Sequence, residues 1–441
     1  MHVFNIPASV PFLHALIEAL VDGRLVEGFT ARDNPERLAQ ATLYLPTRRA
    51  GRLAREVFLD VLNADAVVLP RIVILGDIDE DEGAFADSDI RDSFDLPPAL
   101  GGLQRRLALA QLVGAWARRL RPGSPLIAPL VVGGPASTLA LATDLARLMD
   151  DMATRGVEWA ALDGVVPDAL DQYWKLSLDF LKIAREAWPA YLKESGSIEP
   201  ATRRDLLIAA ESARLQAHHH GPVIAAGSTG SIPATAKLLH EIAKLPQGAV
   251  VLPGLDTELD EDAWRGIGGG SDPHGDMSAP PSSNHPQFAL HALLARFGIE
   301  RRDVTTLSAS GMHGRETLTS EAMRPSATTG QWHRRLAEPE VERAISNAMH
   351  KLAVIEAANP EMEALAIAVA MREARELNLS AALVTPDRAL ARRVMAALDR
   401  WRVTYDDSGG DPLLDTPTGI FARLAARAAC EGLEPPTLLA L

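Results

Sequence analysis

The residues best suited to chemistry are a threonine and four arginines that follow an apolar run at 41–45. They are Thr47, Arg48, Arg49, Arg52 and Arg55. A helix that starts at the carboxyl end of a strand lies where open α/β sheets bind ligands. Arg48, Arg52 and Arg55 share one helix face, and backbone donors at the helix start can join them on a phosphate. The same spacing also fits a solvated arginine face paired with nearby acids, and both interpretations stay open.

A second candidate is the acidic run at 77–82, which contains Asp77, Asp79, Glu80, Asp81 and Glu82. Carboxylates after an apolar strand can bind Mg²⁺ in a nucleotide-hydrolysing or other metal-dependent enzyme. This run has no histidine partners, and carboxylate runs of this kind are more often solvated loops. A metal-dependent hydrolase that uses the run is the alternative function.

The place of a phosphate-binding loop, between the first strand and the first helix, is taken by segment 5–11. A P-loop needs glycines that let the backbone surround phosphates, followed by Lys and Ser or Thr. Segment 5–11 has no glycine and no lysine, and Pro7 and Pro11 remove backbone donors. The chain contains no Gly-Lys dipeptide. The sequence therefore predicts that an intact ATPase site is absent.

The composition sets limits on the class of protein. A chain of 441 residues predicts two or three domains, and 47% hydrophobic with 23% charged residues is a globular composition. The single cysteine, Cys430, excludes an internal disulfide, a cysteine-based zinc site and an iron–sulfur cluster within this chain. At a net charge of −14, any nucleic-acid contact must come from a local basic patch.

No membrane segment or signal peptide is expected. The uncharged segment 125–143 is interrupted by prolines and glycines, which a membrane-spanning helix rarely tolerates in such number. The N-terminus lacks the charged lead and long apolar run of a signal peptide. These features predict a soluble, cytoplasmic protein.

Short apolar runs alternate with segments of helical period, which predicts an α/β fold with a parallel sheet. Strands are expected at 41–45, 71–75, 222–226 and 249–252, and residues 103–217 are almost continuously helical in pattern. Flexible loops are expected at 266–286 and 307–330, which are rich in Gly, Ser, Thr and Pro. Further strands are expected at 352–355, 381–385 and 403–405, with helices from 359, 387 and 416.

Several motifs, in their order and spacing, resemble the AddB subunit family of the AddAB helicase–nuclease in its alphaproteobacterial form. The resemblance runs along most of the chain. Its carriers are Tyr44-Leu-Pro-Thr-Arg-Arg-Ala, Leu69-Pro-Arg-Ile, Leu75-Gly-Asp-Ile-Asp-Glu-Asp-Glu, Ala226-Gly-Ser-Thr-Gly-Ser-Ile-Pro-Ala-Thr, Gly248-Ala-Val-Val-Leu-Pro-Gly-Leu-Asp, His285-Pro-Gln-Phe, Ala382-Leu-Val-Thr-Pro-Asp-Arg-Ala-Leu-Ala and Asp406-Asp-Ser-Gly-Gly.

The resemblance implies a superfamily 1 helicase-like fold, built on a RecA-like parallel sheet, whose N-terminal half has lost its ATPase. Residues 1–102 and 218–357 would form the first RecA-like domain, with 103–217 as an inserted all-helical subdomain. Residues 358–441 would start a second RecA-like domain. The Walker B position falls at 226–227, where no carboxylate stands to hold magnesium.

The resemblance also implies a nucleic-acid-binding set of Thr47, Arg48, Arg49, Arg52 and Arg388, of which the first three match the single-strand contacts of motif Ia. The expected partners are the AddA helicase–nuclease subunit, in a heterodimer, together with DNA ends and single-stranded DNA. The function implied is DNA double-strand-break repair and recombination.

The resemblance assigns no catalytic, cofactor-binding or metal-binding residue to this chain. The family's C-terminal nuclease, with its iron–sulfur cluster and magnesium, is expected to be missing, because no tyrosine is followed by lysine and one cysteine cannot hold a cluster. The chain is expected to be truncated. A protein–protein interaction module that touches no DNA is the remaining alternative.

Overall fold

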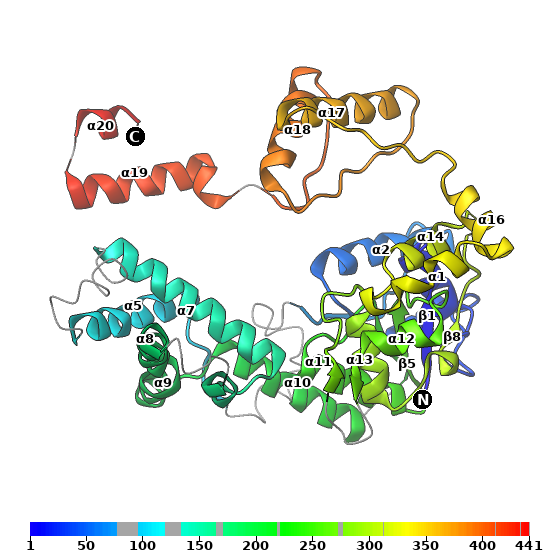
Figure 1. Cartoon of the computed structure of the whole chain (residues 1–441), viewed down its shortest axis with the longest axis horizontal. Helices are drawn as coiled ribbons and strands as arrows, with labels where there is room; N and C mark the ends of the chain where they lie inside the picture. Colours follow the sequence, from blue (N-terminus) through cyan, green and yellow to red (C-terminus); the bar gives the residue numbers. More distant parts are fainter. Residues whose placement is uncertain are drawn as a thin grey trace. The chain divides into compact units, whose positions relative to one another are not determined.

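The computed structural model describes residues 1–76, 96–119, 134–164, 171–217, 221–271, 277–311, 313–410, 412–432 and 434–440. Its internal contacts divide the chain into two compact units, Met1–His350 and Lys351–Leu441 (Figure 1). The first unit holds a six-stranded sheet in the order β3-β2-β4-β5-β1-β8, and every strand pair in it is parallel. The chain is therefore a mixed α/β protein, as the alternation of strand and helix patterns predicted.

The strands are short and mostly buried. They span Val3–Ile6 (β1), Thr42–Leu45 (β2), Arg71–Ile74 (β3), Val223–Ala226 (β4), Gly248–Pro253 (β5) and Thr305–Thr306 (β8). The strands expected at 41–45, 71–75, 222–226 and 249–252 are confirmed to within a residue or so. Near-continuous apolar runs form such strands because helices cover both faces of a parallel sheet.

Alternate residues of the strands face two separate hydrophobic cores. Leu43, Leu45 and Ile224 pack with α1 (Phe12–Val21) and α2 (Arg48–Leu62) on one face. Tyr44 and Ala225 pack on the other face, against α10 (Pro200–Ala217), α11 (Pro233–Lys244), α12 (Glu261–Ile267) and α13 (Phe288–Phe297). Period-2 alternation within a strand produces this division.

The connections give the sheet two switch points at its carboxyl edge. Neighbouring strands β2 and β4 lead into α2 and α11, which cover opposite faces. Neighbouring strands β1 and β5 likewise lead into α1 and α12, again on opposite faces. Where adjacent crossovers diverge in this way, a crevice opens outside the strand ends, and open α/β sheets bind ligands there.

Segment 103–217 forms helices with no strand in its described residues. Four of them are α5 (Gly102–Arg119), α7 (Pro135–Arg155), α8 (Asp171–Lys182) and α9 (Trp188–Ser195), and a π-helical turn at Ile183–Ala187 joins the last two. Leu109, Leu145 and Trp188 form part of a core of their own. The last helix of the segment, α10, instead contributes Ile208 and Leu215 to the core on the sheet.

Two segments expected to be flexible loops contain regular structure. Within 266–286 lie β6 (Gly270–Ser271) and β7 (Met277–Ala279), an antiparallel pair. Within 307–330 lies α14 (Arg315–Ala322), followed by a 3₁₀ turn at Ser326–Gln331. Ser, Thr and Gly have modest helix propensity, and tertiary contacts override it here. Arg324 and Glu321 are buried at this helix end, so packing and ion pairing hold it.

The second unit contains α17 (Pro360–Glu376), α18 (Arg388–Arg400), α19 (Pro417–Glu431) and α20 (Pro435–Ala440). The cap expected at Asn359 is present, since its side chain accepts a hydrogen bond from the Met362 amide at 2.9 Å. The strands expected at 352–355, 381–385 and 403–405 are wrong, because no described residue of this unit forms a strand. Val354 and Val384 are 84% and 93% exposed. Apolar β-branched runs mark strand preference, but a strand also needs a hydrogen-bonded neighbour.

In the part of the chain that the structure describes, no helix is both long and apolar enough to cross a lipid bilayer.

Candidate functional site

The predicted arginine segment forms the first turns of α2, directly after β2. Thr47 is the N-cap residue, and its hydroxyl accepts a hydrogen bond from the Ala50 amide at 3.1 Å. Gly51 lets this helix approach β3 closely, because a Cβ there would lie 2.8 Å from Ile74 Cδ1. The start of α2 is thus fixed at the carboxyl edge of the sheet, beside the switch point between β2 and β4.

The arginine side chains of α2 lie on its solvent side. Arg48, Arg49, Arg52 and Arg55 are exposed, whereas Gly51, Ala54 and Phe58 face the core. Arg48 and Arg49 each interact with another group of the chain, so a phosphate at these two positions would have to compete. The structure brings together Thr47, Arg48, Arg49 and Arg52, four of the five predicted nucleic-acid-binding residues.

The fifth predicted residue, Arg388, belongs to the second unit. Its guanidinium forms a bidentate pair with Asp407, with nitrogen–oxygen distances of 2.9 and 2.7 Å. A Cβ on Gly409 would lie 2.4 Å from Arg388 Nη1, so the loop fits closely around the guanidinium. Paired in this way, Arg388 fastens the 407–410 loop to the start of α18.

The acidic run at 77–82, on which the alternative metal-dependent hydrolase depends, lies outside the described residues. Among residues that the structure does describe, no group of three or more His, Cys, Asp or Glu side chains is arranged to hold a metal ion.

Sequence reasoning missed a cavity of about 490 Å³ at the other switch point. Its walls come from the loops after β1, β5 and β8 and from α14. Seven hydroxyl side chains line it: Ser9, Thr257, Thr306, Ser308, Ser310, Thr319 and Ser320. The charged and imidazole side chains in its lining are Asp256, Glu258, Glu316, Arg315, His285 and His313. None of the lining residues is aromatic apart from these two histidines.

The loop after β1 is tied to the far wall of the cavity. The Ser9 amide donates to Glu316 Oε1 at 2.9 Å, and the Gly311 amide donates to Ser9 Oγ at 2.8 Å. A carboxylate therefore accepts a backbone donor of the strand-to-helix loop, the kind of donor that holds a phosphate in a P-loop protein. In segment 5–11, the Glu316 carboxylate therefore takes the backbone donor that a phosphate would otherwise use.

Helix α14 presents one mostly polar stripe to the cavity. Glu316, Thr319 and Ser320, with Met323 directly after the helix, follow the i, i+3, i+4, i+7 spacing of a single helix face, and all four line the cavity. Stripes with this spacing usually carry apolar residues that face a core. A stripe of this polarity is the sequence signal that would have pointed to the cavity.

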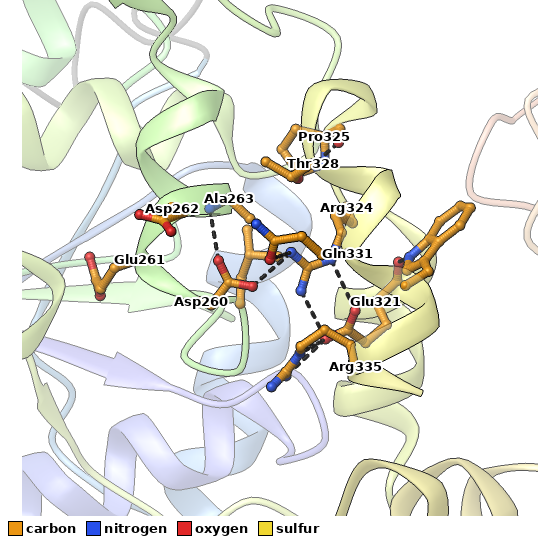
Figure 2. A network of polar contacts seen from close by, with 12 residues as sticks. Asp260, Glu261, Asp262, Ala263, Glu321, Arg324, Pro325, Thr328, Gln331 and Arg335 are labelled. Atoms are coloured by element: carbon orange, nitrogen blue, oxygen red, sulfur yellow. Dashed lines mark hydrogen bonds and ion pairs between the residues drawn. The ribbon is translucent and has the colours of Figure 1, made fainter. Parts of the chain in front are cut away.

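A buried ionic network holds α14 in place from behind (Figure 2). The fully buried guanidinium of Arg324 lies 2.7 Å from Asp260 Oδ2 and 3.0 Å from Glu321 Oε2. Arg335 binds the same Glu321 carboxylate at 2.9 Å. Burial raises the pKa of Asp260, but the hydrogen bond from the Ala263 amide and the Arg324 guanidinium outweigh this and hold that pKa below its ordinary value. The network fastens the cavity's helical wall to α12.

The loop after β5 forms the remaining wall and is also fixed. His285 Nδ1 accepts a hydrogen bond from the Gln287 amide at 3.1 Å, and Nε2 lies 2.7 Å from the Met323 carbonyl oxygen. These two contacts tie the His285 ring to the start of α13 and to the end of α14. Gln287 itself bonds the Gly254 carbonyl and the Asp256 amide. Three of the cavity's walls are thereby held by specific hydrogen bonds.

Compared with known proteins, the chain matches no protein-family model, and no curated protein is significantly similar to it in sequence. The site geometry and the sequence motifs therefore carry the functional argument.

Proposed function

We propose that this chain is an ATPase-inactive, helicase-like part of a DNA double-strand-break repair complex, which binds DNA and scaffolds a helicase–nuclease partner of the AddA kind. One observation carries the proposal. A capped helix start bearing exposed arginines lies at the carboxyl edge of an all-parallel sheet, beside a switch point. Arginines in this position can neutralise phosphates without reading sequence.

The loop after β1 supports the ATPase-inactive part of the proposal. Segment 5–11 lacks glycine and lysine, and the Glu316 carboxylate already accepts the Ser9 amide. A triphosphate placed there would meet this carboxylate at close range, and like charges in such a cleft repel. We expect no ATP hydrolysis by this chain, with or without DNA.

The test is fluorescence anisotropy with a labelled forked DNA at low and moderate salt. The variant Arg48→Glu/Arg52→Glu reverses two charges on one face of α2. The matched control, Arg296→Glu/Arg343→Glu, makes the same change of net charge at exposed positions on α13 and on α16 (Pro339–Ala348). We expect the α2 variant to bind at least tenfold more weakly than wild type, while the control stays within about threefold.

The salt dependence separates phosphate contact from general charge. Each lost contact lowers the slope of log K against log salt by about 0.7 to 0.9, so the α2 variant should lose about 1.4 to 1.8. Equal weakening by the α2 and control variants would mean that net charge alone governs binding. Wild-type binding that survives in the α2 variant would overturn the proposal for this surface.

A further inference from the structure

We propose that the short helix α15 (Trp332–Arg335) carries a second binding surface for single-stranded nucleic acid, on which Trp332 stacks a base and Arg334 contacts a phosphate. The inference rests on the DNA binding proposed above, but it uses none of the α2 arginines and adds contact with bases. Three features carry it: the exposure of the indole, the hydrogen bond that fixes this ring, and the charge beside it.

Trp332 leaves a large aromatic surface in water. The residue is 38% exposed, whereas Trp188 and Trp264 are 1% and 7% exposed. Leu336 follows one helical turn later and is also exposed, so it lies on the same side as Trp332 and extends the apolar surface. Tryptophan is highly buried on average, and exposed apolar surface rimmed by polar residues is typical of interaction sites.

A hydrogen bond fixes the orientation of the indole. Trp332 Nε1 donates to the Glu321 carbonyl oxygen at 2.9 Å. Glu321 is itself buried, and its carboxylate is held by Arg324 at 3.0 Å and by Arg335 at 2.9 Å (Figure 2). The polar edge of the ring is thus bound to the protein, and the carbon part of the ring is left for a partner. A ring held in this way loses little conformational entropy when it binds.

A cationic side chain lies next to this ring in the helix. Arg334 is exposed, and in the part of the chain that the structure describes it forms no ion pair. The nearest acid along the chain is Glu338, which Arg335 binds at 2.7 Å. Segment 331–335 has no acidic residue, although the whole chain has a net charge of −14. The Arg334 guanidinium is therefore available to a phosphate.

An aromatic ring beside an arginine suits unpaired nucleotides. The bases of a duplex are stacked on one another, whereas each base of a single strand offers a flat face to an aromatic side chain. Proteins that bind single strands without reading sequence combine such stacking with cations along the backbone. The α15 surface has both elements, so we expect it to prefer single strands over duplexes and to tolerate any base.

The experiment measures fluorescence anisotropy of the full chain with a labelled oligothymidine strand and with a strand of equal length that lacks bases. Trp332→Ala removes the ring, and Trp332→Phe keeps an aromatic face. Leu413→Ala, at a position that is 75% exposed in the second unit, is the control for the loss of an exposed apolar side chain. Thermal unfolding of each variant checks that the fold is kept.

We expect wild type to bind the oligothymidine strand at least about fivefold more tightly than the abasic strand. Trp332→Ala should lose about this factor on oligothymidine and almost nothing on the abasic strand, because only the first strand has a base to stack. Trp332→Phe should keep most of the affinity, and Leu413→Ala should stay within about twofold of wild type. Arg334→Gln should weaken both strands alike and lower the salt slope by about 0.7.

Equal weakening of both strands by Trp332→Ala would overturn base stacking, because the ring would then only support the surface. Unchanged binding of both strands in this variant would also overturn it, and would leave the ring to a protein partner. If the α2 charge reversal abolishes DNA binding while Trp332→Ala has no effect, this inference fails and the proposed function stands. If wild type binds neither strand nor the forked DNA, both fail.

Discussion

The two switch points of the sheet have the same topology and opposite chemistry. At the end of β2 a helix start projects arginines into solvent, whereas at the ends of β1 and β5 hydroxyls and carboxylates line a cavity that is open to solvent. The first is an exposed surface that carries four arginines of one helix. The second is a hollow lined by seven hydroxyls, three carboxylates and one guanidinium. The same sheet topology therefore carries different side chains at its two switch points.

The two regions are also held together by different forces. The helix behind the arginine surface rests on apolar packing, with Phe58 and Ala54 fully buried and Gly51 against β3. The helix behind the cavity rests on the buried charges of Arg324, Glu321 and Asp260. Packing is insensitive to pH and salt, whereas a buried ionic network depends on every member being present and charged.

The largest expected effect on the free energy of unfolding comes from the buried ionic network that holds α14. Arg324→Met removes a guanidinium that is fully buried between two carboxylates, so Glu321 and Asp260 lose a compensating charge. We expect the free energy of unfolding to fall by about 3–5 kcal/mol, as for other broken buried pairs. Urea denaturation followed by circular dichroism measures it.

The control for this variant is Arg265→Met, which removes a solvent-exposed pair with Asp262 on α12. Exposed pairs contribute little, so its effect should stay below about 1 kcal/mol. Equal effects of the two substitutions would remove the distinction between a buried network and surface pairs.

The strand that precedes α2 is joined to α10, on the opposite face of the sheet, by one buried hydrogen bond. The Tyr44 hydroxyl donates to Glu211, which also binds Arg214. Burial, followed by the charge of Glu211, raises the pKa of Tyr44 well above its ordinary value, so the phenol stays protonated as a donor. Tyr44→Phe should cost about 1–2 kcal/mol of unfolding free energy.

Tyr191→Phe, which keeps the ring stacked on Trp188, is the matched control and should change that free energy by less than about 0.5 kcal/mol. Urea denaturation of both variants provides the comparison. If Tyr44→Phe left the free energy of unfolding unchanged, apolar packing alone would hold α10 on the sheet.

The pH dependence distinguishes the two regions directly. Because the folded pKa of Asp260 lies below its ordinary 3.8, its charge contributes stability that is fully present above pH 3.8 and is lost as pH falls through the lowered folded value. Asp260→Asn keeps the cap on Ala263 but removes the charge beside Arg324. We expect the variant to be less stable than wild type at pH 7, by about 1 kcal/mol.

This difference should shrink steadily between pH 4 and pH 2, as measured by thermal unfolding across that range. Asp262→Asn, at an exposed position on the same helix, is the control for the loss of one carboxylate at pH 7. If the difference in stability between Asp260→Asn and wild type were the same at all pH values, the charge of Asp260 would not stabilise the attachment of α14.

The smallest expected effect is at Gly51. An alanine there gains about 1 kcal/mol of helix propensity, yet its Cβ would lie 2.8 Å from Ile74 Cδ1. Because that atom is the end of a flexible side chain, it can move, and the two terms should cancel to within about 0.5 kcal/mol. Chemical denaturation measures this, and Gly51→Leu, with a larger side chain, should be clearly destabilising. A tolerated leucine would mean that α2 does not pack closely on β3.

Local sequence signals predicted the elements that depend on local physics. The runs at 41–45 and 222–226 predicted strands because short, nearly continuous apolar runs are typical of buried strands in a parallel sheet. The cap Asn359, followed by Pro360, predicted the start of α17 because capping and a fixed proline φ act within a single turn. The arginine spacing of 47–55 predicted an exposed helix face for the same reason.

Sequence patterns did not predict the elements whose formation depends on contacts with distant residues. The strand-like runs at 352–355 and 381–385 have the right residues, but pairing requires a neighbour that no local pattern specifies. Helix α14 was missed because its composition favours a loop, and Arg324 holds it through Asp260, a residue 64 positions earlier in the chain. The spacing of Glu316, Thr319, Ser320 and Met323 can be read as one helix face only once this segment is known to be helical.

By itself, the sequence determined the α/β class, the lack of a phosphate-binding loop and the position of an exposed arginine face. These follow from composition, periodicity and spacing, which are properties of neighbouring residues. Only the tertiary structure decided that Glu316 accepts a hydrogen bond from the loop after β1 and that segments 7–9, 254–258, 285–287, 306–310 and 313–323 contribute to the lining of one cavity. Cavities and buried charges arise where parts of the chain hundreds of residues apart meet, and that meeting is fixed by the order of strands in the sheet.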